Sequence, residues 1–169
     1  DSLDDAIFRR LNGRGFGVRK VLEGVQAAAT AGLGPIKINA VVMKGVNDHC
    51  VVDLARWCKE QGYIARFIEY MDVGNLNHWE SDQVTSVSEI VERIDTELPL
   101  EPAEPNYPGE VAKRWRYKDG TGEIGVIASV TNPFCGDCTR ARLSTDGKLF
   151  TCLFGSVGKD LLGGMRAGA

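Results

Sequence analysis

The sequence lacks the features of a protein that works on a membrane or along a nucleic acid. Its 169 residues contain 20 Lys and Arg against 23 Asp and Glu, a formal net charge of −3. It shows neither a long apolar run nor the pattern of a secretory signal. Because net charge gives no attraction for a polyanion, any anion must be bound by locally clustered Lys and Arg. We therefore expect no membrane partner and no nucleic-acid partner.

The sequence also lacks the cysteine pattern of a disulfide-stapled protein, and it is poor in histidine. Five cysteines are an odd number, and without a secretory signal they indicate a reducing compartment, so we predict a cytoplasmic protein. The two histidines, His49 and His78, lie in polar surroundings that indicate surface or capping roles. Cys50 and Cys58 lie two helical turns apart and are expected to be ordinary, partly buried thiols.

Hydrophobic periodicity in the first hundred residues alternates between that of helices and that of buried strands. A capping box formed by Ser86 and Glu89 marks one helix start. Near-continuous apolar strands separated by helices are typical of a parallel sheet with helices over it, so the fold class is α/β. Helices are expected over residues 2–12, 18–31, 49–61 and 86–97, and strands over "PIKINAVVM" (35–43) and "YIARFIEYM" (63–71).

The character of the chain changes near residue 100. Proline and turn residues become frequent in "LEPAEPNYPGE", and the runs that follow are short and rich in β-forming residues. We predict a boundary there, with an α/β part over residues 1–99 and a smaller, β-containing part over residues 100–169.

Two strands carry charged side chains where apolar ones would suffice. Lys37 and Asn39 alternate, so both point to one face of their strand. On an inner face Lys37 would need an anion, whereas on an edge strand it would lie in solvent, and the sequence leaves both open. Arg66 and Glu69 in "ARFIEYM" raise the same choice between a site and a structural ion pair.

The segment "FCGDCTRARLSTDGKLFTCLF", residues 134–154, holds the strongest chemical signal. Cys135, Cys138 and Cys152 form a C-x2-C-x13-C pattern, and a hairpin turning at Asp146-Gly147 would fold the third cysteine back toward the other two. We predict a metal centre. It is either a structural zinc site that takes a fourth ligand from elsewhere in the fold, or an iron-sulfur cluster with one open iron.

Two arginines directly behind the CxxC bear on that choice. Arg140 and Arg142 alternate, so both can point to one face beside the metal. Guanidinium groups there suit a phosphate or a nucleotide, although a solvated face is the simpler explanation for such a pair.

Four strings together resemble the molybdenum cofactor biosynthesis protein A family of radical S-adenosylmethionine enzymes, the GTP 3',8-cyclases. They are "PIKINAVVMKGVND", "RFIEYMDVG", "NYPGEVAKRWRY" and "FCGDCTRARLSTDGKLFTCLF", and they follow one another in the family's order. The resemblance covers essentially the whole chain. It implies the latter part of an incomplete (βα) TIM-type barrel, followed by a smaller segment that carries an iron-sulfur cluster.

The resemblance also implies an activity, cofactors and partners. Family members cyclise GTP to (8S)-3',8-cyclo-7,8-dihydroguanosine 5'-triphosphate in molybdenum cofactor biosynthesis. A first 4Fe-4S cluster binds S-adenosylmethionine and cleaves it to a radical, and a second 4Fe-4S cluster leaves one iron for GTP. The family often forms homodimers. By resemblance, Cys135, Cys138 and Cys152 ligate the second cluster; Lys37, Arg140, Ala141 and Arg142 bind GTP; and Met71 and Arg66 lie at S-adenosylmethionine.

The chain departs from the family pattern in one respect that matters for activity. The CxxxCxxC motif of the first cluster does not occur in these residues, so that cluster belongs to the full-length protein, and we expect this chain not to turn over alone. Gly163-Gly164 is not the family's terminal Gly-Gly. Two alternatives stay open: a zinc-stabilised binding module, and another radical enzyme with an auxiliary cluster.

Overall fold

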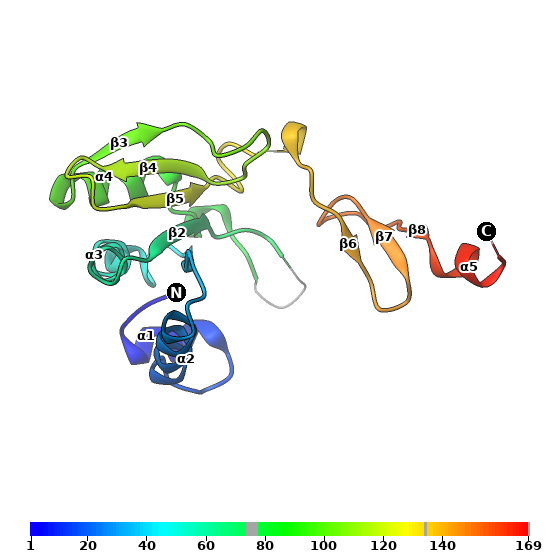
Figure 1. Ribbon diagram of the computed structural model, residues 1–169, viewed down its shortest axis with the longest axis horizontal. Coiled ribbons are helices and arrows are strands. Elements are labelled where there is room, and N and C mark those ends of the chain that lie inside the picture. Colours follow the sequence, from blue (N-terminus) through cyan, green and yellow to red (C-terminus); the bar gives the residue numbers. More distant parts are fainter. Residues whose placement is uncertain (74–77, 134, 169) are drawn as a thin grey trace. The chain divides into compact units, whose positions relative to one another are not determined.

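A computed structural model describes residues 1–73, 78–133 and 135–168 (Figure 1). The chain divides into two compact units, Asp1–Phe134 and Cys135–Ala169, which are described separately below. Strands on both sides of residue 100 share one sheet in the first unit. The boundary between a barrel part and a cluster-bearing part at residue 100 stays a prediction, whereas the compact units divide 35 residues later.

The first unit is built on a five-stranded sheet with the order β1-β2-β5-β4-β3. Strands β1 and β2 are parallel, as predicted, and β5 joins them in parallel although the sequence placed it in the second part; β4 and β3 are antiparallel. The parallel-containing sheet of an α/β fold is therefore confirmed. The strand bounds are β1 Lys37–Val42, β2 Ile64–Glu69, β3 Leu100–Ala103, β4 Lys113–Tyr117 and β5 Glu123–Ile127.

The helices of this unit lie where the sequence predicts them, and local signals explain their ends. Asp4 caps the first helix by accepting a hydrogen bond from the Ile7 amide, so this helix begins three residues later than predicted. Ser86 and Glu89 form the predicted capping box, and Gly62 ends the third helix with a φ of 71°. The bounds are α1 Asp5–Asn12, α2 Arg19–Thr30, α3 Val51–Gln61 and α4 Val87–Glu97.

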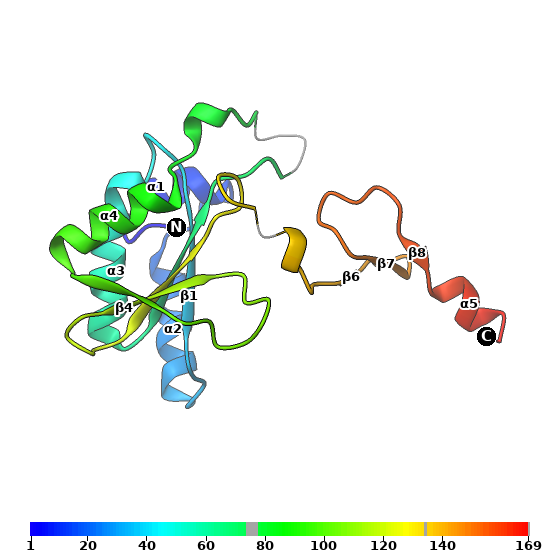
Figure 2. The same ribbon diagram turned by 90° about the horizontal axis from the view of Figure 1, so that it is seen from above.

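The core lies between one face of the sheet and the helices α3 and α4 (Figures 1 and 2). Alternate strand residues such as Ala40, Phe67 and Val126 pack there and are fully or almost fully buried. Cys58 of α3 belongs to this core, with no exposed surface, and burial raises the pKa of its thiol to about 12. The residues between them on each strand therefore point to the opposite side of the sheet, which we call the open face.

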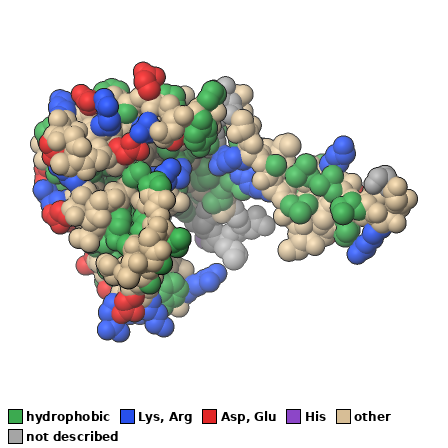
Figure 3. Space-filling model, viewed as in Figure 1, with side chains coloured by type: hydrophobic (Ala, Val, Ile, Leu, Met, Phe, Trp, Pro, Cys, Tyr) green, Lys and Arg blue, Asp and Glu red, His purple; other side chains and the backbone are tan. Residues whose placement is uncertain are grey.

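The second unit contains a small antiparallel sheet with the order β6-β7-β8. The predicted hairpin is confirmed: Arg142 pairs with Phe150, and Gly147 makes the turn with a φ of 78°. None of the residues whose burial is described in this unit is buried, and Figure 3 shows apolar side chains on its surface. The elements are β6 Arg142–Leu143, β7 Lys148–Phe150, β8 Lys159–Asp160 and α5 Leu162–Arg166.

Within the described ranges, no helix has both the length and the apolar character needed to cross a membrane.

Candidate functional site

The open face of the sheet carries the polar residues that the sequence singled out on β1. Ala40 and Val42 point into the core, so Lys37 and Asn39 point to the open face, and both are exposed. The expectation that the two side chains share a face is confirmed. Asn39 pairs in register with Arg66 of the neighbouring strand, which places Arg66 on the same face.

Arg66 runs across a glycine of the next strand. Arg66 and Gly125 are paired in register, and a Cβ atom at Gly125 would lie 3.3 Å from the Cγ atom of Arg66 and 3.3 Å from the Cβ atom of Ala112. The Nε atom of Arg66 is buried and finds no hydrogen-bond partner among the described residues. A buried Nε–H donor without a partner is costly unless a ligand or water satisfies it, so this position of the half-buried Arg66 suits an anion.

Arg66 does not pair with Glu69, because the two side chains leave β2 on opposite faces. Arg66 lies on the open face, whereas Glu69 has no exposed surface and lies on the core side. The structural ion pair between these two residues, which the sequence left open, is therefore not formed.

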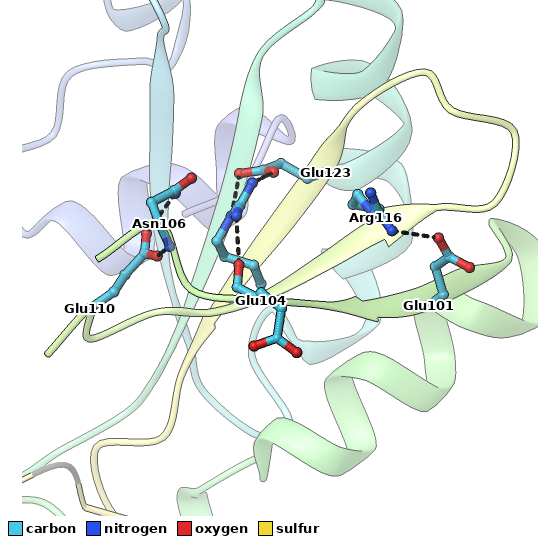
Figure 4. Close-up of polar contacts among 7 residues, drawn as sticks. Glu101, Glu104, Asn106, Glu110, Arg116 and Glu123 are labelled. Atoms are coloured by element: carbon cyan, nitrogen blue, oxygen red, sulfur yellow. Dashed lines mark hydrogen bonds and ion pairs between the residues drawn. The ribbon is translucent and has the colours of Figure 1, made fainter. Parts of the chain in front are cut away.

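A second arginine of the open face, Arg114, already has hydrogen-bond partners, Glu104 and Glu123, which are labelled in Figure 4. Arg114 binds Glu123 with two guanidinium nitrogens, including an Nε to Oε1 distance of 3.2 Å, and donates to the carbonyl oxygen of Glu104 at 2.6 Å. Towards the sheet edge, Arg116 pairs with Glu101 at 3.0 Å. The sequence pattern "KRWRY" does not reveal these pairs, because each carboxylate lies on another strand, Glu123 on β5 and Glu101 on β3.

Glu110 brings a negative charge to the same region. It accepts hydrogen bonds from the amide nitrogen and the side chain of Asn106, at 2.6 and 3.1 Å. Desolvation raises the pKa of Glu110. The Asn106 hydrogen bonds and the charges of Arg114 and Lys37 together lower it by more, so the pKa of Glu110 is below its usual value. Lys37 therefore lies within electrostatic reach of the Glu110 carboxylate.

Glu69 holds the carboxyl end of β2 to two other segments. Its Oε1 atom accepts from the amide of Val87, at the start of α4, at 2.9 Å, and from the Thr131 hydroxyl. Its Oε2 atom accepts from the amides of Val130 and Thr131, both at 2.8 Å. Desolvation raises the pKa of Glu69, but these four hydrogen bonds, led by that of Thr131, bring it below its usual value. Met71, two residues beyond, is half-buried.

In the second unit, Cys135, Cys138 and Cys152 are all free thiols. Cys135 and Cys152 are exposed and Cys138 is half-buried. Within the part of the chain that the structure describes, no three His, Cys, Asp or Glu side chains come close enough together to hold a metal ion. The hairpin by itself therefore does not assemble the three sulfurs. Ligands of a metal centre commonly come together only on binding, so their role as ligands stays a prediction.

The two arginines behind the CxxC both act on Cys138. The amide and the side chain of Arg140 donate to the sulfur and, with the charges of Arg140 and Arg142, lower the pKa of the Cys138 thiol. A thiolate is the form that ligates a metal. Strand β6 begins only at Arg142, so the predicted strand alternation from Arg140 to Arg142 does not apply. Ala141 and Arg140 are exposed, and the NH1 atom of Arg142 is buried without a partner in the described region.

These residues fit an iron-sulfur cluster. Three cysteine thiols, one of them with a lowered pKa, are the donor set that such a cluster uses. The unit that carries them has no buried residue among those whose burial is described, and a segment of that size generally needs a metal or another staple to hold its fold.

Comparison with known proteins decides the family. A family model described as Molybdenum Cofactor Synthesis C matches residues 63–169. The chain belongs to this family. It is 53% identical over 161 residues to the GTP 3',8-cyclase of Acidothermus cellulolyticus, covering 95% of this chain and 44% of that protein. The family that the four strings resemble is confirmed.

Two further relatives bear the same name. The GTP 3',8-cyclase of Xanthomonas axonopodis pv. citri is 48% identical over 161 residues, which are 95% of this chain and 48% of that protein. That of Synechococcus sp. strain WH7803 is 51% identical over 148 residues, which are 85% of this chain and 42% of that protein. The chain thus spans about half the length of the relatives it matches.

Proposed function

We propose that this chain supplies the second 4Fe-4S cluster and part of the GTP site of a GTP 3',8-cyclase of molybdenum cofactor biosynthesis. The observation that carries the proposal is the three-cysteine motif with its two arginines, in a chain about half identical to proteins named GTP 3',8-cyclase. Cys135, Cys138 and Cys152 would hold the cluster. Bound there, the cluster would offer one open iron as a Lewis acid to the substrate.

The remaining site residues divide between the substrate and the cofactor. Arg140, Ala141 and Arg142 form the GTP-binding stretch, where two guanidinium groups beside Cys138 favour an anionic guest. Lys37 on the open face contacts the GTP phosphates. Met71 and Arg66 lie at S-adenosylmethionine, and the Nε atom of Arg66, which has no partner among the described residues, supports a polar ligand on the open face.

The wider arrangement belongs to the same proposal. The parallel strands β1, β2 and β5 form the latter part of an incomplete (βα) barrel, whose interior is the open face. The protein acts in the cytoplasm as a homodimer. Because the sequence contains no CxxxCxxC motif, this chain alone does not cleave S-adenosylmethionine.

Anaerobic reconstitution followed by metal analysis tests the proposal. We expect iron and sulfide in cluster stoichiometry, and a cluster spectrum that GTP perturbs. Arg140→Ala should abolish the effect of GTP while retaining the cluster, and Arg166→Ala, a charge-matched change in α5, should leave it intact. Zinc without iron would instead favour the zinc-stabilised binding module. A cluster that does not respond to GTP would favour another radical enzyme with an auxiliary cluster.

A further inference from the structure

Glu69 is a fully buried carboxylate at the edge of the sheet where ligands of parallel α/β proteins bind. It sits at the carboxyl end of β2, in register with Val42 of β1. Met71 follows Glu69 by two positions in the sequence. A buried carboxylate is retained at such a place only if its hydrogen bonds compensate for its desolvation.

The hydrogen bonds of Glu69 join segments that are far apart in the sequence. One donor lies 18 residues away, at the amino end of α4, and the others lie 61 and 62 residues away. The two consecutive amides of Val130 and Thr131 both point at Oε2 at 2.8 Å. These contacts hold the chain just after it leaves β5.

The segment held in this way leads into the cysteine motif. Thr131 precedes Cys135 by four residues, and the segment between β5 and Cys135 has no regular secondary structure in its described residues. Without a ladder of backbone hydrogen bonds, a loop depends on side-chain partners to hold one conformation. Among the described residues, the single Glu69 carboxylate accepts three hydrogen bonds from Val130 and Thr131.

We propose that Glu69 is a positioning residue, which anchors the start of the segment that carries the CxxC and thereby sets the environment of the metal centre. It acts through Val130 and Thr131. The inference rests on the proposed function, because it takes Cys135 and Cys138 to be cluster ligands.

The test compares three variants of the full chain after anaerobic reconstitution. Glu69→Gln keeps the shape of the side chain and replaces one acceptor oxygen with a donor amide that faces other donors. Thr131→Val removes only the hydroxyl donor. It serves as the second test variant if Glu69→Gln does not fold. Ile94→Ala is the control for lost stability, since Ile94 is a fully buried residue of α4 that contributes to the core.

Two readouts distinguish positioning from general loosening. In Glu69→Gln, amide exchange at Val130 and Thr131 should accelerate at least tenfold, and the electron paramagnetic resonance signal of the reduced cluster should shift or broaden. Thr131→Val should show the same changes to a smaller extent. Ile94→Ala should leave the cluster signal at its wild-type position.

Each result has one meaning. A wild-type chain that takes up no iron would overturn the proposed function, and with it the role of Glu69 at a cluster. A wild-type cluster whose signal is the same in Glu69→Gln and Thr131→Val would overturn the inference alone. So would a shift of equal size in Ile94→Ala, because it would show that the signal follows stability and not the hydrogen bonds of Glu69.

Discussion

Arg66 lies across Gly125, with its Cγ atom 3.3 Å from the place that a Cβ atom at residue 125 would occupy. The two residues pair in register on adjacent parallel strands. A Cβ atom on β5 at this point would crowd the Arg66 side chain, which would have to shift to make room. The absence of a side chain at Gly125 thus lets the Arg66 side chain lie over β5.

Gly125→Ala should therefore weaken ligand binding more than its size suggests. The new methyl group would be crowded by both Arg66 and Ala112, and overpacking of this kind typically costs about 1–3 kcal/mol. We expect the affinity for S-adenosylmethionine, measured by calorimetry, to fall about tenfold, which corresponds to about 1.4 kcal/mol. Gly24→Ala is the matched control, because a Cβ atom there meets nothing within 4 Å. Unchanged affinity in Gly125→Ala would contradict this role for the glycine.

The pKa of Glu69 predicts how stability depends on pH. The pKa in the folded protein lies below its ordinary value of 4.5, so the carboxylate stabilises the fold fully above pH 4.5, and this contribution is lost as pH falls through the folded-state pKa. Glu69→Gln should lower the free energy of unfolding by about 2–4 kcal/mol at pH 7. The difference from wild type should shrink as the pH is lowered towards 3.

Urea unfolding at a series of pH values measures this difference. Glu92→Gln, an exposed change on α4, should leave the free energy of unfolding near the wild-type value throughout. A difference between wild type and Glu69→Gln that stays constant from pH 7 to pH 3 would show that the charge of Glu69 does not contribute.

The two ion pairs on the open face should differ in strength. Arg114 and Glu123 have side chains that are only 19% and 18% exposed, against 58% and 47% for Arg116 and Glu101. Glu123→Gln should lower the free energy of unfolding by about 1–3 kcal/mol, because it disrupts a bidentate, partly buried ion pair. Glu101→Gln should cost less than about 1 kcal/mol. Equal losses in chemical denaturation would show that burial does not strengthen the Arg114 pair.

Removing a cluster ligand should affect the fold of the second unit as well as the metal. Cys152→Ala should bring bound iron well below the wild-type level and increase amide exchange in β6 and β7, because none of the residues whose burial is described in this unit is buried. Cys50→Ala, in the first unit, should leave both unchanged. Full iron occupancy in Cys152→Ala would show that the third ligand comes from elsewhere.

Much of the fold could be predicted because its signals are local. The capping box of Ser86 with Glu89 and the turn at Asp146-Gly147 act within a few residues, so each is readable from a short string. The alternation of Lys37 and Asn39 likewise follows from the geometry of a single strand. The antiparallel addition of β3 and β4 to the parallel sheet was not predicted, because strand pairing joins residues far apart in the chain.

The sequence by itself determined the family, the helices, the positions of strands β1 and β2 and the chemical character of the cysteine motif, since these depend on residue type and spacing. The expectation that these strands are buried on both faces was wrong, because Lys37 and Asn39 of β1 are exposed. Only the tertiary structure decided the partners of Glu69, which lie up to 62 residues away. It also decided that Arg66 crosses Gly125 and leaves Glu69 on the other side of the sheet. The physical reason is that a charged side chain takes its role from the groups that surround it after folding, and strand register brings those groups together.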